Sequence, residues 1–267
     1  MDISNNLLDL FNHYFEVIHA DTPEKLRECY RLRFEVYYKE GLFPGMNTDD
    51  YPNELECDEY DERSMHYLLV HKPTRTIAGT VRVIPTDREN PNKKLPLEIV
   101  AGDLFFQDAT AYNEIQRSQL GEISRLVLTL GFRTRKGENR QPYGGILNDP
   151  DDHFKKSEQH QFQNIDQHKN EQRRIFPHAV IGLFVAIVQM SVKLNLIYWY
   201  CNMDPALARF LRAFGITFKP ISPVIDYHGP RQGYLGCIPD IMDNIHRTNE
   251  SLWRLLTENG ALFSKPK

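Results

Sequence analysis

Glu122 and Arg125 stand in the middle of an otherwise apolar stretch, GEISRLVL at residues 121–128. The Leu, Ile and Val residues of this stretch, bounded by turn-forming residues, predict a β-strand. An unpaired acid or guanidinium is costly to bury in such a strand, so charges that face water from an edge strand are the simplest explanation. A carboxyl group whose pKa is raised by partial burial would instead suit a general base, and Glu122 is our candidate for that role.

Four other charged residues have unusual surroundings in the first half of the chain. Arg82 interrupts an apolar strand expected at residues 76–84, and Arg33 adjoins the apolar face of an expected helix. Asp58 and Asp61 belong to an acidic run, where solvated side chains are the usual case. The run lacks the alternating oxygen ligands and central glycine of a calcium loop, so we expect no metal site. A solvated surface charge remains the alternative for Arg33.

The elements that must position these residues alternate between strands and helices. Asp21-Thr22-Pro23 is a strong helix start, and apolar residues at spacings of three and four extend that helix to Lys39. A loop rich in turn formers follows, up to Glu56. Strands are expected at residues 15–18, 64–71, 76–84, 121–128, 196–201, 216–225 and 233–238. Three further long helices are expected at 176–194, 205–214 and 239–258. This order predicts an α/β fold with a mixed sheet.

Residues 131–174 differ from the rest of the chain because they are polar, rich in Gln, Asn, His and Lys, and contain few apolar side chains. Such a segment has little apolar surface to order it. We interpret it as an insertion that forms a lid, a surface helix or a partly disordered loop. Its basic residues, of which Arg133 is the first, are candidates to meet an anionic ligand, although a solvated charge cluster explains them equally well.

Composition narrows the class of protein. The 267 residues are 41% hydrophobic and 25% charged, which is ordinary for a globular protein, and the net charge of −4 gives no reason to expect nucleic acid. Four widely separated cysteines favour neither a zinc site nor a disulfide framework and suit a reducing cytoplasm. The first residues lack a signal-peptide pattern, and the longest apolar run, at residues 179–190, is too short to span a bilayer. A cytoplasmic protein without a transmembrane segment is therefore expected.

The order of elements resembles that of the Gcn5-related N-acetyltransferase (GNAT) fold, and the charged residues sharpen the likeness. Arg33 and Tyr37 resemble the Arg-x-x-x-Phe motif of acyl-homoserine lactone synthases, and Phe43 falls where that family has Trp. Three further motifs follow in the family's order over roughly residues 26–130. They are Asp58-x-x-Asp61, the hairpin that carries Arg82, and Glu122-x-x-Arg125. Beyond that range the resemblance is one of fold only.

The chain most resembles the bacterial acyltransferases associated with the PEP-CTERM/exosortase system, which are similar to lactone synthases and to long-chain N-acyl amino acid synthases. The resemblance implies a single GNAT-like domain over residues 1–267, with a mixed central sheet flanked by helices and the insertion at about 131–174. It implies transfer of a fatty acyl group from a phosphopantetheine thioester, on acyl carrier protein or coenzyme A, to a small amine such as an amino acid. No tightly bound cofactor and no metal are expected.

The same resemblance assigns roles to residues. It implies a linked electrostatic cluster beside the acceptor pocket. The members of this cluster are Arg33, Asp58, Asp61, Arg82, Glu122 and Arg125. Tyr37 and Phe43 would be pocket aromatics. The acyl donor would lie along the central strand and the apolar helix, at Leu126, Val127, Leu128, Phe184 and Val188. No Gly-rich phosphate loop precedes Phe176, which favours acyl carrier protein, an acidic partner that basic residues of the insertion would attract.

Two other functions remain open: a lactone-type synthase that uses S-adenosylmethionine, and a non-catalytic module that binds an acyl group or its carrier. Tyr37 and Phe43 replace the lactone-synthase Phe and Trp, which favours a different amine acceptor. Retention of both motif aspartates with Glu122 and Arg125 favours catalysis, since a binding module would not require them. Residues 122 and 125 point to opposite faces of a regular strand, so either a bulge turns one of them or they serve different sides.

Overall fold

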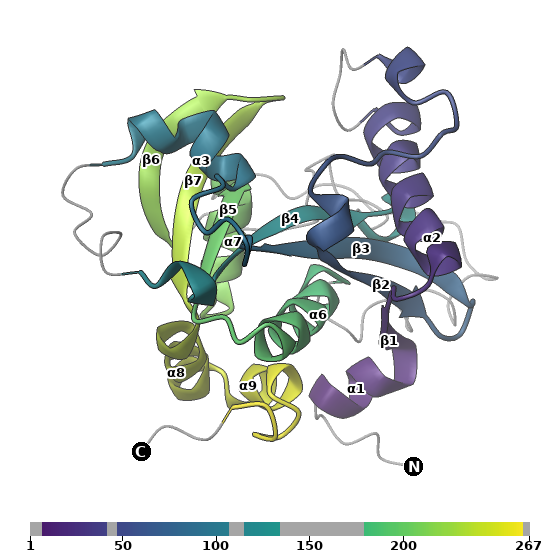
Figure 1. Ribbon diagram of the computed structural model, residues 1–267. Coiled ribbons are helices and arrows are strands. Elements are labelled where there is room, and N and C mark those ends of the chain that lie inside the picture. Colours follow the sequence, from purple (N-terminus) through teal and green to yellow (C-terminus); the bar gives the residue numbers. More distant parts are fainter. Residues whose placement is uncertain (1–6, 42–46, 107–114, 134–178, 264–267) are drawn as a thin grey trace, which may run out of the picture.

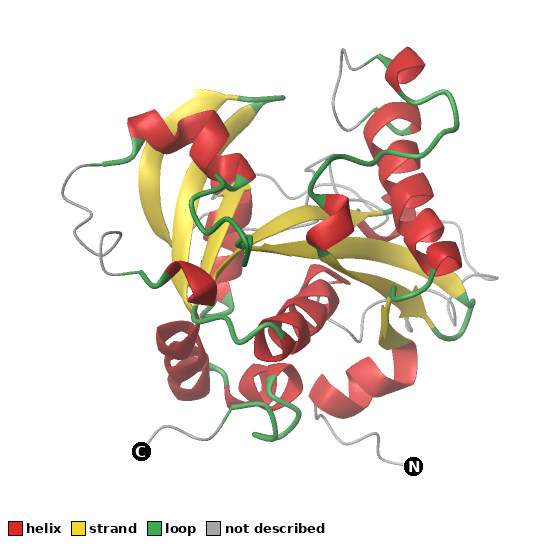
Figure 2. Ribbon diagram, in the orientation of Figure 1, coloured by secondary structure: helices red, strands yellow, loops and turns green. Residues whose placement is uncertain are grey.

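The computed structural model describes residues 7–41, 47–106, 115–133 and 179–263. In this part of the chain seven strands form one mixed sheet in the order β1-β2-β3-β4-β5-β7-β6 (Figures 1 and 2). The strands are β1 (Phe15–His19), β2 (Met65–His71), β3 (Thr76–Pro85), β4 (Leu120–Leu128), β5 (Tyr198–Met203), β6 (Lys219–Asp226) and β7 (Pro230–Cys237). The predicted α/β fold with a mixed central sheet, GNAT-like in its order of elements, is confirmed.

Helices cover both faces of this sheet. They are α1 (Leu7–Tyr14), α2 (Pro23–Phe34), α3 (Pro96–Ala101), α4 (Leu130–Arg133), α6 (Ala179–Lys193), α7 (Pro205–Ala213), α8 (Ile238–Thr248) and α9 (Glu250–Leu256). Short π or 3-10 turns are η1 (Glu35–Lys39), η2 (Thr48–Asp50), η3 (Asp61–Arg63), η4 (Gly102–Leu104) and η6 (Arg117–Gln119). Figure 1 shows α2 and α3 on one side of the sheet and α1, α6, α8 and α9 on the other.

The sheet is divided where β4 meets β5. Strands β1 to β4 are antiparallel neighbours, as are β5, β7 and β6, but β4 and β5 are parallel. The parallel pairing runs only from Leu120 opposite Tyr198 to Ile123 opposite Cys201. Beyond that pair the strands separate, so the continuation of β4 faces a gap instead of a strand.

Side chains of β4 and β5 alternate between the two faces. Ile123 and Cys201 belong to the main core, which contains the buried helix α6. Tyr200 faces the opposite side, in a second core with Leu97 of α3, and Glu122 is its register partner. The apolar helix expected at 176–194 is therefore a core element in its described part. No helix in the described ranges, α6 included, has the length and hydropathy to cross a membrane.

A β-bulge in β4 resolves the question of how residues 122 and 125 are oriented. Arg82 pairs with Ser124 and Thr80 pairs with Val127, so two residues of β4, at 125 and 126, lie opposite a single residue of β3, at 81. Arg125 lies in the extra length and has a φ of 52°, the left-handed conformation that side chains rarely adopt. The bulge turns Arg125 out of the alternation, and both motif residues border the same cavity, described below.

Two expected helices are divided in the structure. The helix predicted at 23–39 is α-helical to Phe34 and ends in the π turn η1. The helix predicted at 239–258 is two helices, because Asn249 between them is not helical (φ −154°) and its side chain caps α9 by accepting a hydrogen bond from Leu252 N at 3.1 Å. Most of the expected insertion, from residue 134 onward, lies outside the described residues.

Replacing Asn249 by Ala is expected to lower the free energy of unfolding by about 1 kcal/mol, because the Leu252 N–H loses its acceptor. Urea unfolding monitored by circular dichroism measures the change. Asn249→Ser, which keeps a capping oxygen, is the control and should stay within a few tenths of a kcal/mol of the wild type. Equal stability of the Ala variant and the wild type would show that the break between α8 and α9 does not depend on the cap.

Candidate active site

Six charged side chains form a closed ring in which each arginine contacts two carboxylates and each carboxylate contacts two arginines. In order around this charge ring, they are Arg33, Asp61, Arg82, Asp58, Arg125 and Glu56. The members come from α2, the loop before η3, η3 itself, β3 and β4. Five of them were predicted from the sequence, and the structure brings all five together.

The pairs inside the ring have the geometry of strong hydrogen bonds. Arg33 is bidentate to Asp61, with Nη1–Oδ1 and Nη2–Oδ2 distances of 2.8 and 2.7 Å. Arg82 is bidentate to Asp58 at 2.6 and 2.7 Å. Arg125 joins the two halves, because its Nε donates to Glu56 Oε1 at 3.0 Å and its Nη2 to Asp58 Oδ2 at 2.9 Å. Bidentate charge-assisted hydrogen bonds of this kind fix the relative orientation of the two side chains and are stronger than bonds between neutral groups.

Most side chains of the ring are buried, so their charges are neutralised by one another and not by water. Arg33 and Arg82 are 1% exposed and Glu56 is 2% exposed, whereas the Arg125 side chain is 30% exposed and faces the cavity described below. Burial alone would raise the pKa of Asp61, but the hydrogen bond and charge of Arg33 and the charge of Arg82 hold that pKa well below its usual range. The pKa of Asp58 is lowered for the same reason, by Arg82 and Arg125. Both aspartates are therefore ionised at neutral pH.

The structure excludes the alternative considered for Arg33 and adds a sixth residue to the ring. The Arg33 side chain is not a solvated surface charge but is buried under the Tyr30 ring, with its Cζ 4.9 Å from the ring centre. Glu56, which the sequence suggested only as the end of a polar loop, is the sixth member and contacts Arg33 and Arg125. The acidic run at 56–62 gave a weak signal for it, since three neighbouring arginines need three carboxylates to be neutralised.

Glu122 stands apart from the charge ring. It is 3% exposed, and in the described part of the chain its carboxylate makes no ion pair; Oε2 accepts a hydrogen bond from Leu97 N, in the first turn of α3, at 2.9 Å. Burial raises the pKa of Glu122 to about 8, a shift that the Leu97 hydrogen bond and the nearby Arg82 only partly offset. The expected raised pKa is confirmed in direction, and its cause is desolvation. Glu122 is thus a neutral carboxyl group that ionises just above neutral pH.

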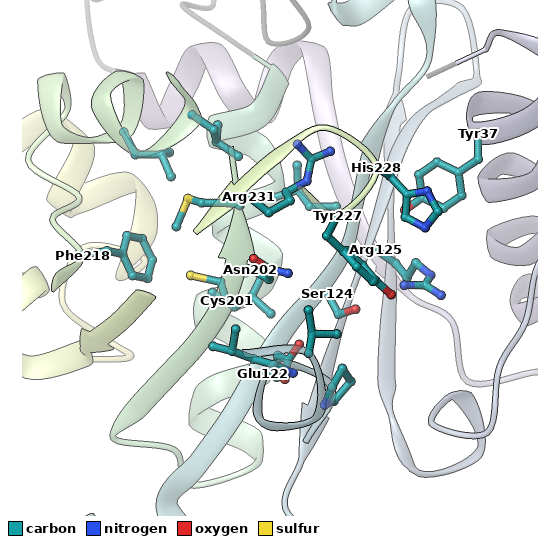
Figure 3. Close-up of a pocket in the computed structure, with 18 of the residues that line it drawn as sticks. Tyr37, Glu122, Ser124, Arg125, Cys201, Asn202, Phe218, Tyr227, His228 and Arg231 are labelled. Carbon is teal, nitrogen blue, oxygen red and sulfur yellow. Dashed lines mark hydrogen bonds between the residues drawn. The ribbon is translucent and has the colours of Figure 1, made fainter. Parts of the chain in front are cut away.

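A cavity of about 210 Å³ opens where β4 and β5 separate. Its polar side carries Glu56, Glu122, Ser124, Arg125 and Asn202, and Figure 3 shows Glu122, Ser124 and Asn202 grouped at this side. Its apolar side is formed by Phe184 of α6, Leu207 and Leu211 of α7, Met203 and Phe218. The cavity therefore presents an ionisable carboxyl group and an apolar wall to the same space.

Aromatic and basic residues close the cavity on the side of α2. Tyr37, in the π turn η1, is buried and lines the cavity, which agrees with its expected place as a pocket aromatic. Phe43, the other expected aromatic, lies outside the described residues. Tyr227, His228 and Arg231 reach the cavity from the β6–β7 hairpin (Figure 3). The two strands of this hairpin were expected at 216–225 and 233–238, but none of its turn residues was predicted to belong to the site. His228 and Gly229 in the turn have positive φ angles, of 55° and 96°.

The residues expected to bind the acyl donor divide into two groups. Leu126 and Phe184 line the cavity. Val127 instead packs with Leu32 and Val36 of the α2 region, and Leu128 and Val188 belong to the main core. The bulge explains why Leu126 lines the cavity and Val127 does not, because it changes the face on which the side chains after Arg125 lie. Arg133 likewise is 9% exposed and forms an ion pair with Glu40, so it does not offer its charge to a partner protein.

The described residues contain no group of three or more His, Cys, Asp or Glu side chains arranged to hold a metal ion. The acids closest to such an arrangement are those of the charge ring, and arginines occupy their oxygens. His66, which is buried beside Asp61, has its pKa lowered to about 4 by burial and is neutral. Among the acids that line the cavity, Glu122 is therefore the one outside the charge ring.

Asp61→Ala is expected to lower the free energy of unfolding by about 3–5 kcal/mol, because it leaves two buried arginines without a shared partner. Arg125→Ala should also destabilise, but less, since Arg125 is partly exposed. The matched control is Lys39→Ala, which breaks the exposed Lys39–Glu54 pair and should cost at most about 1 kcal/mol. Chemical unfolding measures all three, and an Asp61→Ala effect as small as the control would contradict a structural role for the ring.

Comparison with known proteins supports the fold. Residues 32–140 match the model of a family described as an acetyltransferase (GNAT) domain. No curated protein matches the sequence. Among solved structures, TofI in a ternary complex with an inhibitor and MTA has a TM-score of 0.54 at 14% identity, over 90% of this chain and 96% of that one.

Two further structures are similar over most of both chains. FeeM, an N-acyl amino acid synthase from uncultured soil microbes, has a TM-score of 0.52 at 11% identity, over 86% of this chain and 93% of that one. BjaI, a CoA-dependent acyl-homoserine lactone synthase with MTA, has a TM-score of 0.54 at 15% identity, covering 96% of this chain and 91% of that one. At such identities the likeness is one of fold. The described chain therefore has the fold of GNAT-type acyltransferases, and its residues 32–140 match the GNAT domain.

Proposed function

We propose that this protein is an N-acyltransferase that moves a fatty acyl group from a phosphopantetheine thioester to a small amine. The observation that carries the proposal is Glu122, a buried carboxyl group with a pKa raised to about 8, on the wall of a cavity that opens between β4 and β5. A base whose pKa lies near the working pH is the most effective kind. The match of residues 32–140 to an acetyltransferase domain supports the same class of reaction.

The proposed reaction has one proton for Glu122 to accept. The amine nitrogen attacks the thioester carbonyl and forms the new C–N bond, and Glu122 removes a proton from that nitrogen directly or through a water molecule. The C–S bond then breaks, and the thiolate leaves and takes up a proton. Backbone N–H groups near the gap between β4 and β5 are the donors best placed to stabilise the oxyanion.

The gap between the strands and the apolar cavity wall suit the acyl donor. Past Ile123 and Cys201 the two strands no longer pair, so an extended amide-bearing arm fits between Ser124–Leu126 and Asn202. The acyl chain would then lie against Phe184 and the apolar residues of α7. Burial of each methylene there contributes about 0.8 kcal/mol. This assigns the donor side of the site to β4, β5, α6 and α7, and we propose acyl carrier protein as the carrier.

The charge ring acts in this proposal as a positioning device. Its contacts with Glu56 and Asp58 hold Arg125 in the bulge, and Arg125 lines the cavity together with Tyr37. The acceptor would bind beside these two residues. Since its six charges are mutually neutralised, the ring adds little net field to the cavity. Its contribution is rigidity at the wall where the amine must be held within a few tenths of an ångström.

A lactone-type synthase is the second candidate, because BjaI and other structures of similar fold are lactone synthases. Tyr37 stands where those enzymes have Phe, by the motif resemblance, and this favours another acceptor. A non-catalytic binding module would have no need of a desolvated carboxyl group such as Glu122 in the cavity. The motif resemblance also leads us to place the chain among the acyltransferases of the PEP-CTERM/exosortase system.

The direct test is to incubate acyl carrier thioester with a mixed pool of amines, including S-adenosylmethionine, and to determine the product mass. The expected kcat/KM rises with pH as Glu122 ionises, with a half-maximum near pH 8. Glu122→Gln should lower kcat by about 10²–10⁴-fold and lose that dependence, while the amine's own titration persists in both proteins.

Stability provides a control for this assignment. Because the folded-state pKa of Glu122 is raised, its neutral form favours folding, and the wild type should lose stability as pH rises from about 4.5 to about 8. Glu122→Gln lacks that loss and should gain stability relative to the wild type at pH 8. A Gln variant with wild-type activity, or a lactone as the product, would overturn the proposed reaction.

The apolar wall predicts a preference for acyl chains longer than acetyl. A turnover series from two to twelve carbons on acyl carrier protein and on coenzyme A should show kcat/KM increasing with length until the cavity is filled, and higher values on the carrier protein. Leu211→Trp, which fills the α7 side, should shift the optimum to shorter chains. Best activity with acetyl-coenzyme A in the wild type would contradict the assignment of this wall to the acyl chain.

A further inference from the structure

The N-terminus of α3 holds the carboxyl group of Glu122. Leu97 is the second residue of α3, and the first amides of a helix have no acceptor within it. Leu97 N donates instead to Glu122 Oε2 at 2.9 Å. In the described part of the chain no donor contacts Oε1, so Oε1 is the oxygen left to carry and exchange the proton. The orientation of the proposed base therefore depends on where α3 begins.

Arg117 fixes the start of α3. It lies in η6, five residues before Glu122, and its guanidinium contacts the loop that leads into the helix. Nε donates to Pro91 O at 3.0 Å, and Nη2 donates to Lys93 O at 3.1 Å. Nη1 and Nη2 also donate to the two carboxylate oxygens of Glu98, in the first turn of α3. One side chain thus ties the loop and the helix to the segment that precedes β4.

Glu98 connects this contact to the backbone of α3. Its Oε2 accepts a hydrogen bond from Leu95 N at 2.8 Å, which satisfies the amide just before the helix. Pro96, the first residue of α3, has no N–H group. Leu97 N is therefore the first amide of the helix that can donate outward, and it is the one that reaches Glu122. A continuous path of hydrogen bonds and helix backbone joins Glu98 to the carboxyl group of Glu122.

The Arg117–Glu98 pair also affects the charge around Glu122. The two side chains are 28% and 17% exposed, so water screens them only in part. The charged and titratable side chains that interact with Glu122 come from several elements, and they are Arg82 of β3, Arg125 of β4, Glu98 of α3, Cys201 of β5 and Tyr60. After burial, the charge of Glu98 is what raises the pKa of Glu122, whereas the Leu97 hydrogen bond and both arginines lower it. Arg117 is the cation that neutralises Glu98.

We propose that Arg117 is a positioning residue for Glu122, which it orients through α3 and whose electrostatic surroundings it adjusts by neutralising Glu98. This inference rests on the proposed role of Glu122 as the base and deepens it. Among the described residues that form the wall of the cavity, neither Arg117 nor Glu98 is present. Their effect on the reaction must therefore pass through Glu122.

The test follows the ionisation of Glu122 directly, by carbon-13 NMR of the glutamate carboxyl groups, with Glu122→Gln to identify the signal. Arg117→Gln leaves Glu98 without its cation and loosens the N-terminus of α3, and both changes should raise the measured pKa. Glu98→Gln keeps a side-chain oxygen for Leu95 N but removes the negative charge, which should lower that pKa. Arg117→Lys keeps the positive charge and should lie between wild type and Arg117→Gln.

Activity gives an independent readout. Arg117→Gln should lower kcat by about tenfold or more, because a misplaced base removes the proton less effectively, and should leave KM for the acyl thioester unchanged. The pH of half-maximal kcat/KM should move in the same direction as the measured pKa in each variant. Arg254→Gln, on exposed α9, is the matched control and should leave kcat and the pKa of Glu122 unchanged.

A purely structural role of Arg117 predicts a different pattern. Both Gln variants would then admit water to Glu122 and lower its pKa alike, and that result, or an unchanged pKa in Arg117→Gln, would overturn the inference. Should Arg117→Gln not fold, Arg117→Lys and Glu98→Gln replace it, and shifts of the same sign in these two would also overturn the inference. If the wild type acylates no amine, the proposed function fails, while the signs of the pKa shifts still decide whether Arg117 positions Glu122.

Discussion

The mutual neutralisation of three arginines and three carboxylates is the interaction on which the rest of this structure depends. Desolvating six charges costs several kcal/mol per ion, and only a complete set of partners compensates it. A closed ring achieves this because each group has two opposite neighbours. Removing one member leaves each of its two neighbours with one partner in place of two. The main effect of the ring is therefore to favour a single arrangement of α2, η3, β3 and β4. Its net contribution to the free energy of folding is small, because the attraction between the charges mostly offsets the cost of desolvating them.

The ring also explains the conformation of β4. Arg125 lies at a positive φ in a bulge, which costs free energy for a residue with a side chain, and contacts with Glu56 and Asp58 offset that cost. The bulge coincides with the point where β4 leaves β5. The same contacts that neutralise the arginine thus fix the bulge at the edge of the cavity.

Glu122, three residues before Arg125 in the sequence, has its pKa shifted in the opposite direction from the ring aspartates. The ring aspartates are kept ionised by arginines, whereas Glu122 has no cation as a direct partner in the described chain and is kept neutral by burial. The surroundings of the two kinds of carboxyl group thus separate their pKa values. The β6–β7 hairpin adds Tyr227, His228 and Arg231 to the wall of the cavity.

The sequence by itself predicted the seven strands and most of the helices, and its motif resemblance indicated five of the six ring members. Helix caps, apolar periodicity and turn residues are local, so the α/β order could be predicted from them, as could the unusual charges at Arg82 and Arg125. The tertiary structure decided what local spacing does not encode. Glu56, Asn202 and Arg231 acquire their places only when distant segments meet, and the bulge reverses the side-chain alternation that spacing assumes. Whether a charge is buried, and which partner it has, depends on neighbours that are distant in sequence.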